Sequence, residues 1–184
     1  MNPLLKGEGL ALVRGGRLLF EGLDLELGSG DALHVSGPNG SGKSSLIRLV
    51  AGLLRPTAGR IERAEAALAD NLLALDRELP LSRALAFWMG PNLTRATLAF
   101  ALDELAHVPV RLLSTGQVKR AQLARVMASG APLWLLDEPQ NGLDRNGLAE
   151  LDVAITEHRA QGGAVLAASH TPLAGQWRTM ELAS

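Results

Sequence analysis

Residues 33–44 of this 184-residue chain read LHVSGPNGSGKS, a short, partly apolar run followed by a glycine-rich loop. The run over residues 33–36 is read as a short strand, and residues 45–54 read as a buried helix. Glycines let the backbone curl so that successive N–H groups point at an anion, and the helix N-terminus adds further free N–H groups. The sequence therefore predicts a phosphate-binding loop between a strand and a helix. The residues expected to hold the phosphates are Gly37, Pro38, Asn39, Gly40, Ser41, Gly42, Lys43, Ser44 and Ser45.

Two side chains at the end of this loop add the chemistry that the backbone lacks. Lys43 offers a full positive charge to the β- and γ-phosphates of a nucleotide, and the Ser44 hydroxyl can ligate Mg²⁺. The spacing GxxxxGKS between a strand and a helix is the context that such a nucleotide-binding loop requires. We therefore expect ATP and Mg²⁺ as the ligands of this loop.

A second apolar run, residues 133–136, ends in Asp137 and Glu138. Ligands of open parallel sheets bind at the carboxyl ends of the strands, so Asp137 is expected near the phosphate loop, where it can hold Mg²⁺ through water. Glu138 is then placed to polarise the attacking water. The alternative is a surface turn that begins with two acids, and the presence of the phosphate loop disfavours it.

A third segment lies just before an expected helix over residues 118–129. It places a serine hydroxyl and free backbone N–H groups at the helix N-terminus, which makes a second anion site. A plain helix cap is the commoner role of such a serine, but the position shortly before Asp137 favours the anion site. The residues of this segment are Ser114, Thr115, Gly116 and Gln117.

The rest of the chain alternates apolar strands with helices, which predicts an α/β fold with a mainly parallel core sheet. Short strands are expected over residues 10–13, 18–20 and 23–27, and their turns indicate a small antiparallel β layer. Residues 60–113 have a mostly helical pattern. Its clearest helix is expected over residues 96–106. Nearer the C-terminus we expect a helix over residues 147–160 and a strand over residues 164–168. The length fits one domain, residues 1–184.

Composition excludes several classes of protein. The net charge of −1 gives no reason to expect nucleic acid, and the absence of cysteine removes disulfides, thiol catalysis and cysteine metal sites. The four histidines show no metal-ligand spacing. No apolar run reaches the roughly 20 residues that span a bilayer, so the expected location is cytoplasmic, with any membrane role depending on an integral partner.

The order and spacing of these motifs resemble those of ABC transporter ATPase subunits over nearly the whole chain. Residues 37–44, 113–117 and 133–138 look like the Walker A, signature and Walker B motifs of that family. Asp144 looks like the D-loop residue, and His170 like the switch histidine. The resemblance implies a P-loop NTPase fold of the ABC ATPase type, with a shortened helical subdomain over about residues 72–130.

The resemblance also implies a head-to-tail dimer in which a second copy completes each ATP site. Lys43 and Ser44 of one copy would face Ser114, Thr115, Gly116 and Gln117 of the other. Asp137 and Ser44 would hold Mg²⁺. Glu138 would orient the attacking water, and His170 would contact the γ-phosphate.

Three positions depart from the family pattern. Thr115 stands where the signature usually has its second glycine, so a side chain points at the dimer interface. The glutamine expected near residues 74–78 is missing, and Asp76 or Glu78 could substitute as an oxygen ligand. The chain has no tyrosine, and the base-stacking position falls near Arg14. Arg14 or Arg17 could stack on the adenine by its planar guanidinium, or be a solvated surface arginine.

Residues 135–144, 162–166 and 169–173 are similar to the CcmA family, the ATP-binding subunits of the haem exporter of cytochrome c biogenesis. That similarity implies ATP turnover that powers a membrane complex, with an integral permease subunit and haem-handling partners. It places the chain peripherally on the cytoplasmic face of the bacterial inner membrane. The alternatives are an ABC ATPase for another exported substrate and a nucleotide-binding module that hydrolyses little. A soluble ABC-type protein that acts on ribosomes or DNA is disfavoured, because the chain has one P-loop and no long insertion.

Overall fold

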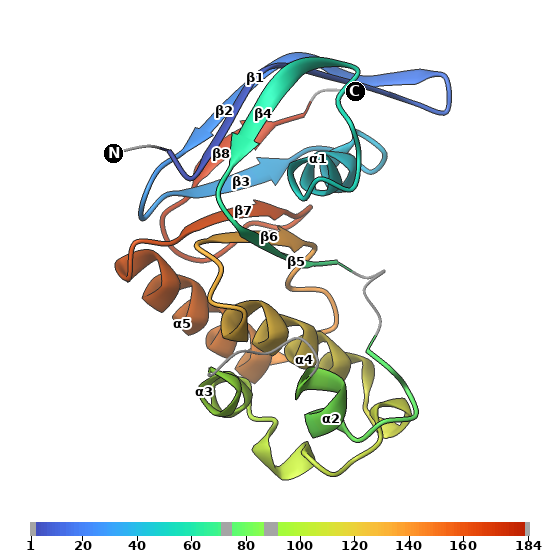
Figure 1. The fold of residues 1–184 in the computed structure, drawn as a ribbon, viewed down its shortest axis with the longest axis vertical. Coiled ribbons are helices and arrows are strands. Elements are labelled where there is room, and N and C mark those ends of the chain that lie inside the picture. Colours follow the sequence, from blue (N-terminus) through green and yellow to red (C-terminus); the bar gives the residue numbers. More distant parts are fainter. Residues whose placement is uncertain (1–2, 71–74, 87–91, 183–184) are drawn as a thin grey trace.

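A five-stranded parallel sheet forms the centre of the molecule (Figure 1). The computed structural model describes residues 3–70, 75–86 and 92–182. The strand order is β5-β6-β7-β3-β8. The strands are β3 (Ala32–Ser36), β5 (Ala66–Ala69), β6 (Leu133–Asp137), β7 (Ala164–Ala168) and β8 (Arg178–Glu181). The predicted fold class is confirmed, because apolar parallel strands are interleaved with helices.

A three-stranded antiparallel sheet in the order β2-β1-β4 is the second layer. Its strands are β1 (Leu5–Arg14), β2 (Arg17–Leu27) and β4 (Ala58–Arg63). The turn between β1 and β2 falls at Gly15 and Gly16, and both have positive φ. The strands expected over residues 18–20 and 23–27 are one strand, β2. It runs through Gly22, whose φ of 63° lies in the left-handed region that glycine tolerates.

The helices are divided between the two faces of the parallel sheet (Figure 1). Helix α1 (Lys43–Val50) packs with the antiparallel sheet on one face. Helices α2 (Leu81–Ala86), α3 (Leu93–Ala99), α4 (Thr115–Ala128) and α5 (Arg145–Ala160) lie toward the other. Two short 3₁₀ helices, η1 (Asp103–Leu105) and η2 (Val110–Leu112), connect α3 to α4.

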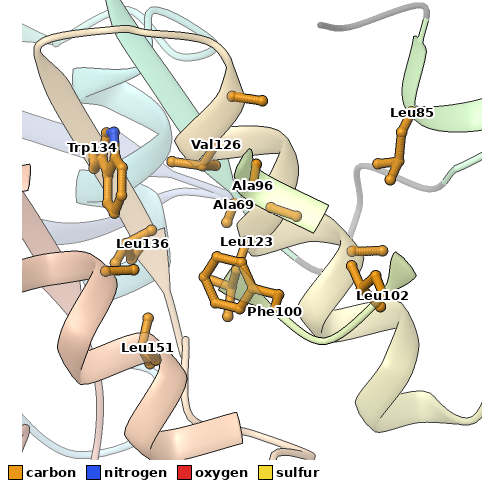
Figure 2. Close-up of a cluster of buried hydrophobic side chains, with 14 of the residues drawn as sticks. Ala69, Leu85, Ala96, Phe100, Leu102, Leu123, Val126, Trp134, Leu136 and Leu151 are labelled. Atoms are coloured by element: carbon orange, nitrogen blue, oxygen red, sulfur yellow. The ribbon is translucent and has the colours of Figure 1, made fainter. Parts of the chain in front are cut away.

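Strand β6 contributes side chains to two hydrophobic clusters, one on each face of the parallel sheet. Successive side chains of a strand point to opposite faces. Leu133 and Leu135 belong to the cluster with α1, whereas Trp134 and Leu136 belong to the cluster with α4 and α5. Figure 2 shows Trp134 and Leu136 in that second cluster, together with Leu151 of α5. Because both faces are covered, residues 133–136 of β6 are all apolar, and Asp137 follows at the carboxyl end of the strand.

The mostly helical expectation for residues 60–113 is wrong in part. The segment contains the end of β4 and all of β5, and β4 is an edge strand whose exposed side chains give no apolar pattern. The helix expected over residues 96–106 exists, but its bounds are wrong. Helix α3 ends at Ala99, and Ala101 follows with a φ of 48°, which interrupts helical geometry before η1. Strand β8 was not predicted, because only its interior neighbour β3 makes it a strand.

Among the described residues, no helix combines the length and apolar character needed to cross a membrane.

His158 on α5 predicts how stability varies with pH. Its ring stacks on Trp134 at 4.0 Å between centroids, and its Nε2 atom is buried with no hydrogen-bond partner in the described structure. Burial lowers the pKa of His158 below its ordinary value of about 6.5. The unfolded chain therefore binds more protons than the folded chain in the interval between the two pKa values. We expect His158 to contribute stability above pH ~6.5 that is lost as the pH falls toward the folded-state pKa.

The test is the free energy of unfolding in urea at several pH values between 5 and 8. In His158→Gln the free energy of unfolding should fall less steeply as the pH is lowered, whatever the effect of the substitution at neutral pH. His107→Gln is the matched control, because His107 is exposed. If the free energy of unfolding of His158→Gln varies with pH as steeply as that of the unmodified chain, this histidine does not cause the loss of stability.

Candidate active site

The phosphate loop lies between β3 and α1, and two of its glycines are required by close contacts. Gly37 has a φ of 141°, and a Cβ there would lie 2.6 Å from the carbonyl oxygen of Leu182. Gly42 has a φ of 102° at the N-terminus of α1, and a Cβ there would lie 3.2 Å from Leu19 Cβ. Larger residues at these positions would distort the loop, so its shape depends on glycine.

Lys43 and Ser44 begin helix α1 and point in different directions. The Lys43 ammonium donates to the carbonyl oxygens of Gly37 and Pro38 at 2.7 and 2.9 Å, so the side chain folds along the loop. The Ser44 hydroxyl donates to Asp137 Oδ1 at 2.9 Å. The structure thus brings Ser44 and Asp137 together across the sheet.

A pocket of about 300 Å³ opens over this loop. Its lining combines backbone and side chains of the loop with the wall provided by β1, β2 and the residue after β6. The lining residues are Arg14, Leu19, Asn39, Gly40, Gly42, Lys43, Ser44, Ser45 and Glu138. Ser41 is itself a residue of the loop, and its hydroxyl is buried and has no hydrogen-bond partner within the described structure.

Asp137 is the last residue of β6 and is 6% exposed. Burial raises the pKa of its carboxyl, and the hydrogen bond from Ser44 opposes that rise. A carboxylate that is partly desolvated and already paired to a hydroxyl is suited to share a small hard cation with it, because Mg²⁺ prefers oxygen ligands.

Glu138 and His170 come from neighbouring strands and meet beside the pocket. Glu138 Oε2 lies 2.8 Å from His170 Nδ1. His170 follows β7, and its side chain is 51% exposed. Glu138 has a φ of 47°, and its backbone N–H donates to the carbonyl of Ala168 at 2.8 Å. The left-handed backbone turns Glu138 out of the strand toward the pocket wall, where its side chain can face a phosphate.

The segment Ser114–Gln117 forms a capping box at the start of α4. Ser114 Oγ accepts from the backbone N–H of Gln117 at 3.2 Å, and Gln117 Oε1 accepts from the N–H of Ser114 at 2.9 Å. Thr115 is exposed at the first position of the helix. The cap that the sequence allows is therefore present, and it leaves the other N–H groups of the first turn free to bind an anion.

Asp144 lies close to this segment. It caps α5 by accepting from the N–H of Gly147 at 2.8 Å, and Arg120 of α4 donates to the same oxygen at 2.6 Å. These two donors lower the pKa of Asp144. A hollow of about 360 Å³ is lined by both segments and by Arg120. Arg120 was not predicted, because its contact with Asp144 arises only from the packing of α4 against α5.

The hollow over Ser114–Gln117 and the pocket over the phosphate loop have different linings. One chain therefore presents two separate polar surfaces.

Of the residues considered as replacements for missing family side chains, only Arg14 lines the pocket over the phosphate loop. Arg14 lines the phosphate pocket, and its Nη1 atom lies 3.4 Å from Ser45 Oγ, whereas Arg17 is outside the lining. Asp76 accepts from the backbone N–H of Glu78, and Glu78 pairs with Arg111 at 3.4 Å. Neither acid lines the phosphate pocket. Part of the 74–78 stretch, residue 74, lies outside the described residues.

Comparisons with known proteins agree with this geometry. The ABC transporter family profile matches residues 20–141. The "Cytochrome c biogenesis ATP-binding export protein CcmA" of Sphingopyxis alaskensis is 59% identical over 181 residues, which cover 95% of this chain and 93% of that protein. The protein of the same name from Novosphingobium aromaticivorans is 58% identical, over 90% of this chain and 87% of that protein.

The chain belongs to the CcmA family of ABC transporter ATPases. The resemblance that the motifs predict is confirmed, and the chain is an ABC-type ATPase with a role in cytochrome c biogenesis. The solved structure of an ATP-binding subunit of an ABC transporter superposes with a TM-score of 0.83. It is 22% identical and covers 91% of this chain and 79% of that chain, so it supports the fold of this CcmA-family member.

The close approach of Gly116 to Gly142, which lies just before Asp144, can be tested by adding one methyl group at Gly116. A Cβ at Gly116 would lie 2.7 Å from the carbonyl oxygen of Gly142, so either α4 or that segment must shift. We expect Gly116→Ala to lower the free energy of unfolding by about 1–3 kcal/mol, measured in urea. Gly28→Ala is the matched control, because the nearest atom to its added Cβ, Asp31 Oδ2, is 3.8 Å away. Equal stability of the two variants would contradict the close approach.

Proposed function

We propose that two copies of this chain close on two ATP molecules and hydrolyse them to drive a membrane complex that hands over haem during cytochrome c biogenesis. The main support is the contact between Ser44 and Asp137, which places a Walker A hydroxyl and a Walker B carboxylate 2.9 Å apart beside a pocket lined by Lys43 and Glu138. The relatives' printed names, which describe ATP-binding export proteins of cytochrome c biogenesis, support the choice of process.

In this proposal the phosphate loop and Lys43 bind the β- and γ-phosphates. Ser44 and Asp137 fit Mg²⁺ by their chemistry, because both present oxygen atoms, and the ion would offset the phosphate charge. Glu138 orients a water molecule for in-line attack on the γ-phosphorus. His170 holds Glu138 Oε2 and contacts the γ-phosphate from its exposed side.

The second copy supplies the signature segment. Two observations support an intermolecular site: the hollow over Ser114–Gln117 is separate from the phosphate pocket, and Thr115 is exposed at its rim. The free N–H groups of α4 and the Ser114 hydroxyl would meet the γ-phosphate of the ATP bound to the other copy. Asp144 lies in the same hollow and would accompany the signature across the dimer interface. Thr115 adds a hydroxyl and a methyl group where the family usually has glycine.

The proposed membrane partner is an integral permease at the cytoplasmic face of the bacterial inner membrane, to which this chain binds peripherally. The helical subdomain, about residues 72–130, would move against the permease as the dimer closes and opens. Haem would be handled by the partners rather than by this chain. An ABC ATPase for another exported substrate would use the same nucleotide site. Identification of the membrane proteins that co-purify with the full chain separates the two cases.

Two substitutions test the ATPase site in the full chain. Glu138→Gln keeps the shape of the side chain but removes its charge, so steady ATP turnover should fall by about a hundredfold or more while ATP binding is retained. Lys43→Ala removes one positive charge from the phosphates, so ATP affinity itself should fall. The measurements are phosphate release and equilibrium nucleotide binding.

Lys6→Met is the control for loss of a lysine, since Lys6 is 44% exposed on β1. Normal turnover in Lys43→Ala would contradict the site assignment. A Glu138→Gln variant that turns over like the unmodified chain would favour the rival interpretation, a nucleotide-binding module whose weak hydrolysis does not depend on this residue.

A further inference from the structure

Lys119 is a buried cation that the proposed mechanism does not use. It lies on α4 and is 4% exposed, and its ammonium donates to the backbone carbonyl oxygen of Asp137 at 3.3 Å. Burial lowers the pKa of Lys119, and the negative charges of Asp137, Glu138 and Asp70 oppose that shift. A methionine would fill similar space without the cost of removing a charge from water. A buried ammonium at this place therefore calls for a specific explanation.

The carbonyl that Lys119 contacts belongs to the peptide group joining Asp137 to Glu138. The N–H of the same peptide group donates to the carbonyl of Ala168 at 2.8 Å. The peptide is therefore held at its oxygen by α4 and at its nitrogen by β7. Such a group cannot rotate unless it loses one of these hydrogen bonds.

Glu138 needs this restraint, because its backbone is unfavourable. Its φ of 47° lies in the left-handed region, where the Cβ atom of a residue other than glycine comes too close to the backbone. Residues in such conformations persist only where the surroundings hold them, and they cluster at functional sites. Rotation of the 137–138 peptide would relax Glu138, and it would also move the carboxylate away from His170 Nδ1 and from the pocket wall.

We propose that Lys119 is a positioning residue for Glu138, which it holds in its left-handed conformation through the carbonyl oxygen of Asp137. This proposal rests on the role of Glu138 given above. Lys119 would also connect the signature segment at the start of α4 with Glu138, which are separate motifs in the sequence. Lys119 is four residues, about one helical turn, beyond Thr115, so both lie on the same side of α4. Engagement of the signature segment by ATP on the second copy would thereby be transmitted to the water-orienting glutamate of the first.

The test compares Lys119→Met with the full unmodified chain, using ATP and Mg²⁺. We expect kcat to fall by about ten- to a hundredfold, because the glutamate is misplaced, while the KM for ATP and the Mg²⁺ concentration for half-maximal rate change by less than about twofold. Lys119→Arg keeps a cationic donor and should recover most of the turnover.

A second measurement separates positioning from a general structural role. If Lys119 acts only through Glu138, then adding Lys119→Met to Glu138→Gln should not lower the residual single-turnover rate any further. Lys6→Met again serves as the matched control, because Lys6, Lys43 and Lys119 are the only lysines in the chain. Should Lys119→Met fail to fold, Lys119→Gln is expected to show the same loss of kcat, because its shorter amide cannot reach the Asp137 carbonyl.

Three results would overturn the proposal. The first is a kcat for Lys119→Met equal to that of Lys6→Met. The second is a loss expressed mainly in KM or in the Mg²⁺ requirement, which would place the action of Lys119 at the phosphates or at Asp137. The third is a further loss in the Glu138→Gln background. Turnover that does not depend on Glu138 at all would instead refute the proposed function, and the inference with it.

Discussion

The hydrogen bond from Ser44 to Asp137 joins residues that are 93 positions apart, and the arrangement of the site depends on it. It exists because β7 alone separates β3 from β6 and all three strands run in the same direction. Their carboxyl ends therefore share one edge, where the phosphate loop follows β3 and the acids end β6. His170 reaches the same edge from β7. A change of strand order would leave each motif intact and abolish the site.

Burial of charged side chains fixes their positions at this edge of the sheet. Lys43 and Asp137 are almost entirely shielded from water, and each has identified hydrogen-bond partners within the site. Charges in such surroundings interact more strongly than at the surface, and an unpaired one would be costly. The same reasoning applies to Lys119, whose ammonium contacts the backbone rather than a carboxylate. The site is thus held by contacts between elements that lie far apart in the sequence, including α4, which begins with the signature segment.

The sequence predicts some elements well for identifiable reasons. The strands expected over residues 33–36, 133–136 and 164–168 match β3, β6 and β7 closely. The last two are covered on both faces, so they read as continuous apolar runs. The secondary structure of the Ala- and Leu-rich segment that follows α1 is harder to predict, because alanine is compatible with both helix and strand. Its strand β5 is defined by pairing with β6, and the helix expected over residues 96–106 is interrupted where Ala101 adopts a positive φ.

By itself, the sequence determined which chemistry this protein can offer: a glycine-rich loop predicted to cradle a phosphate, the lysine and hydroxyl that follow it, the paired acids, and the family to which the motifs belong. These are local patterns, since each depends on the spacing of side chains along one loop or strand. Only the tertiary structure decided how the motifs meet. It brought Ser44 to Asp137 and Glu138 to His170, and it kept the signature segment apart from the phosphate pocket. It also revealed Lys119 beneath Asp137, because a buried contact between a helix and a distant strand leaves no periodic pattern in the sequence.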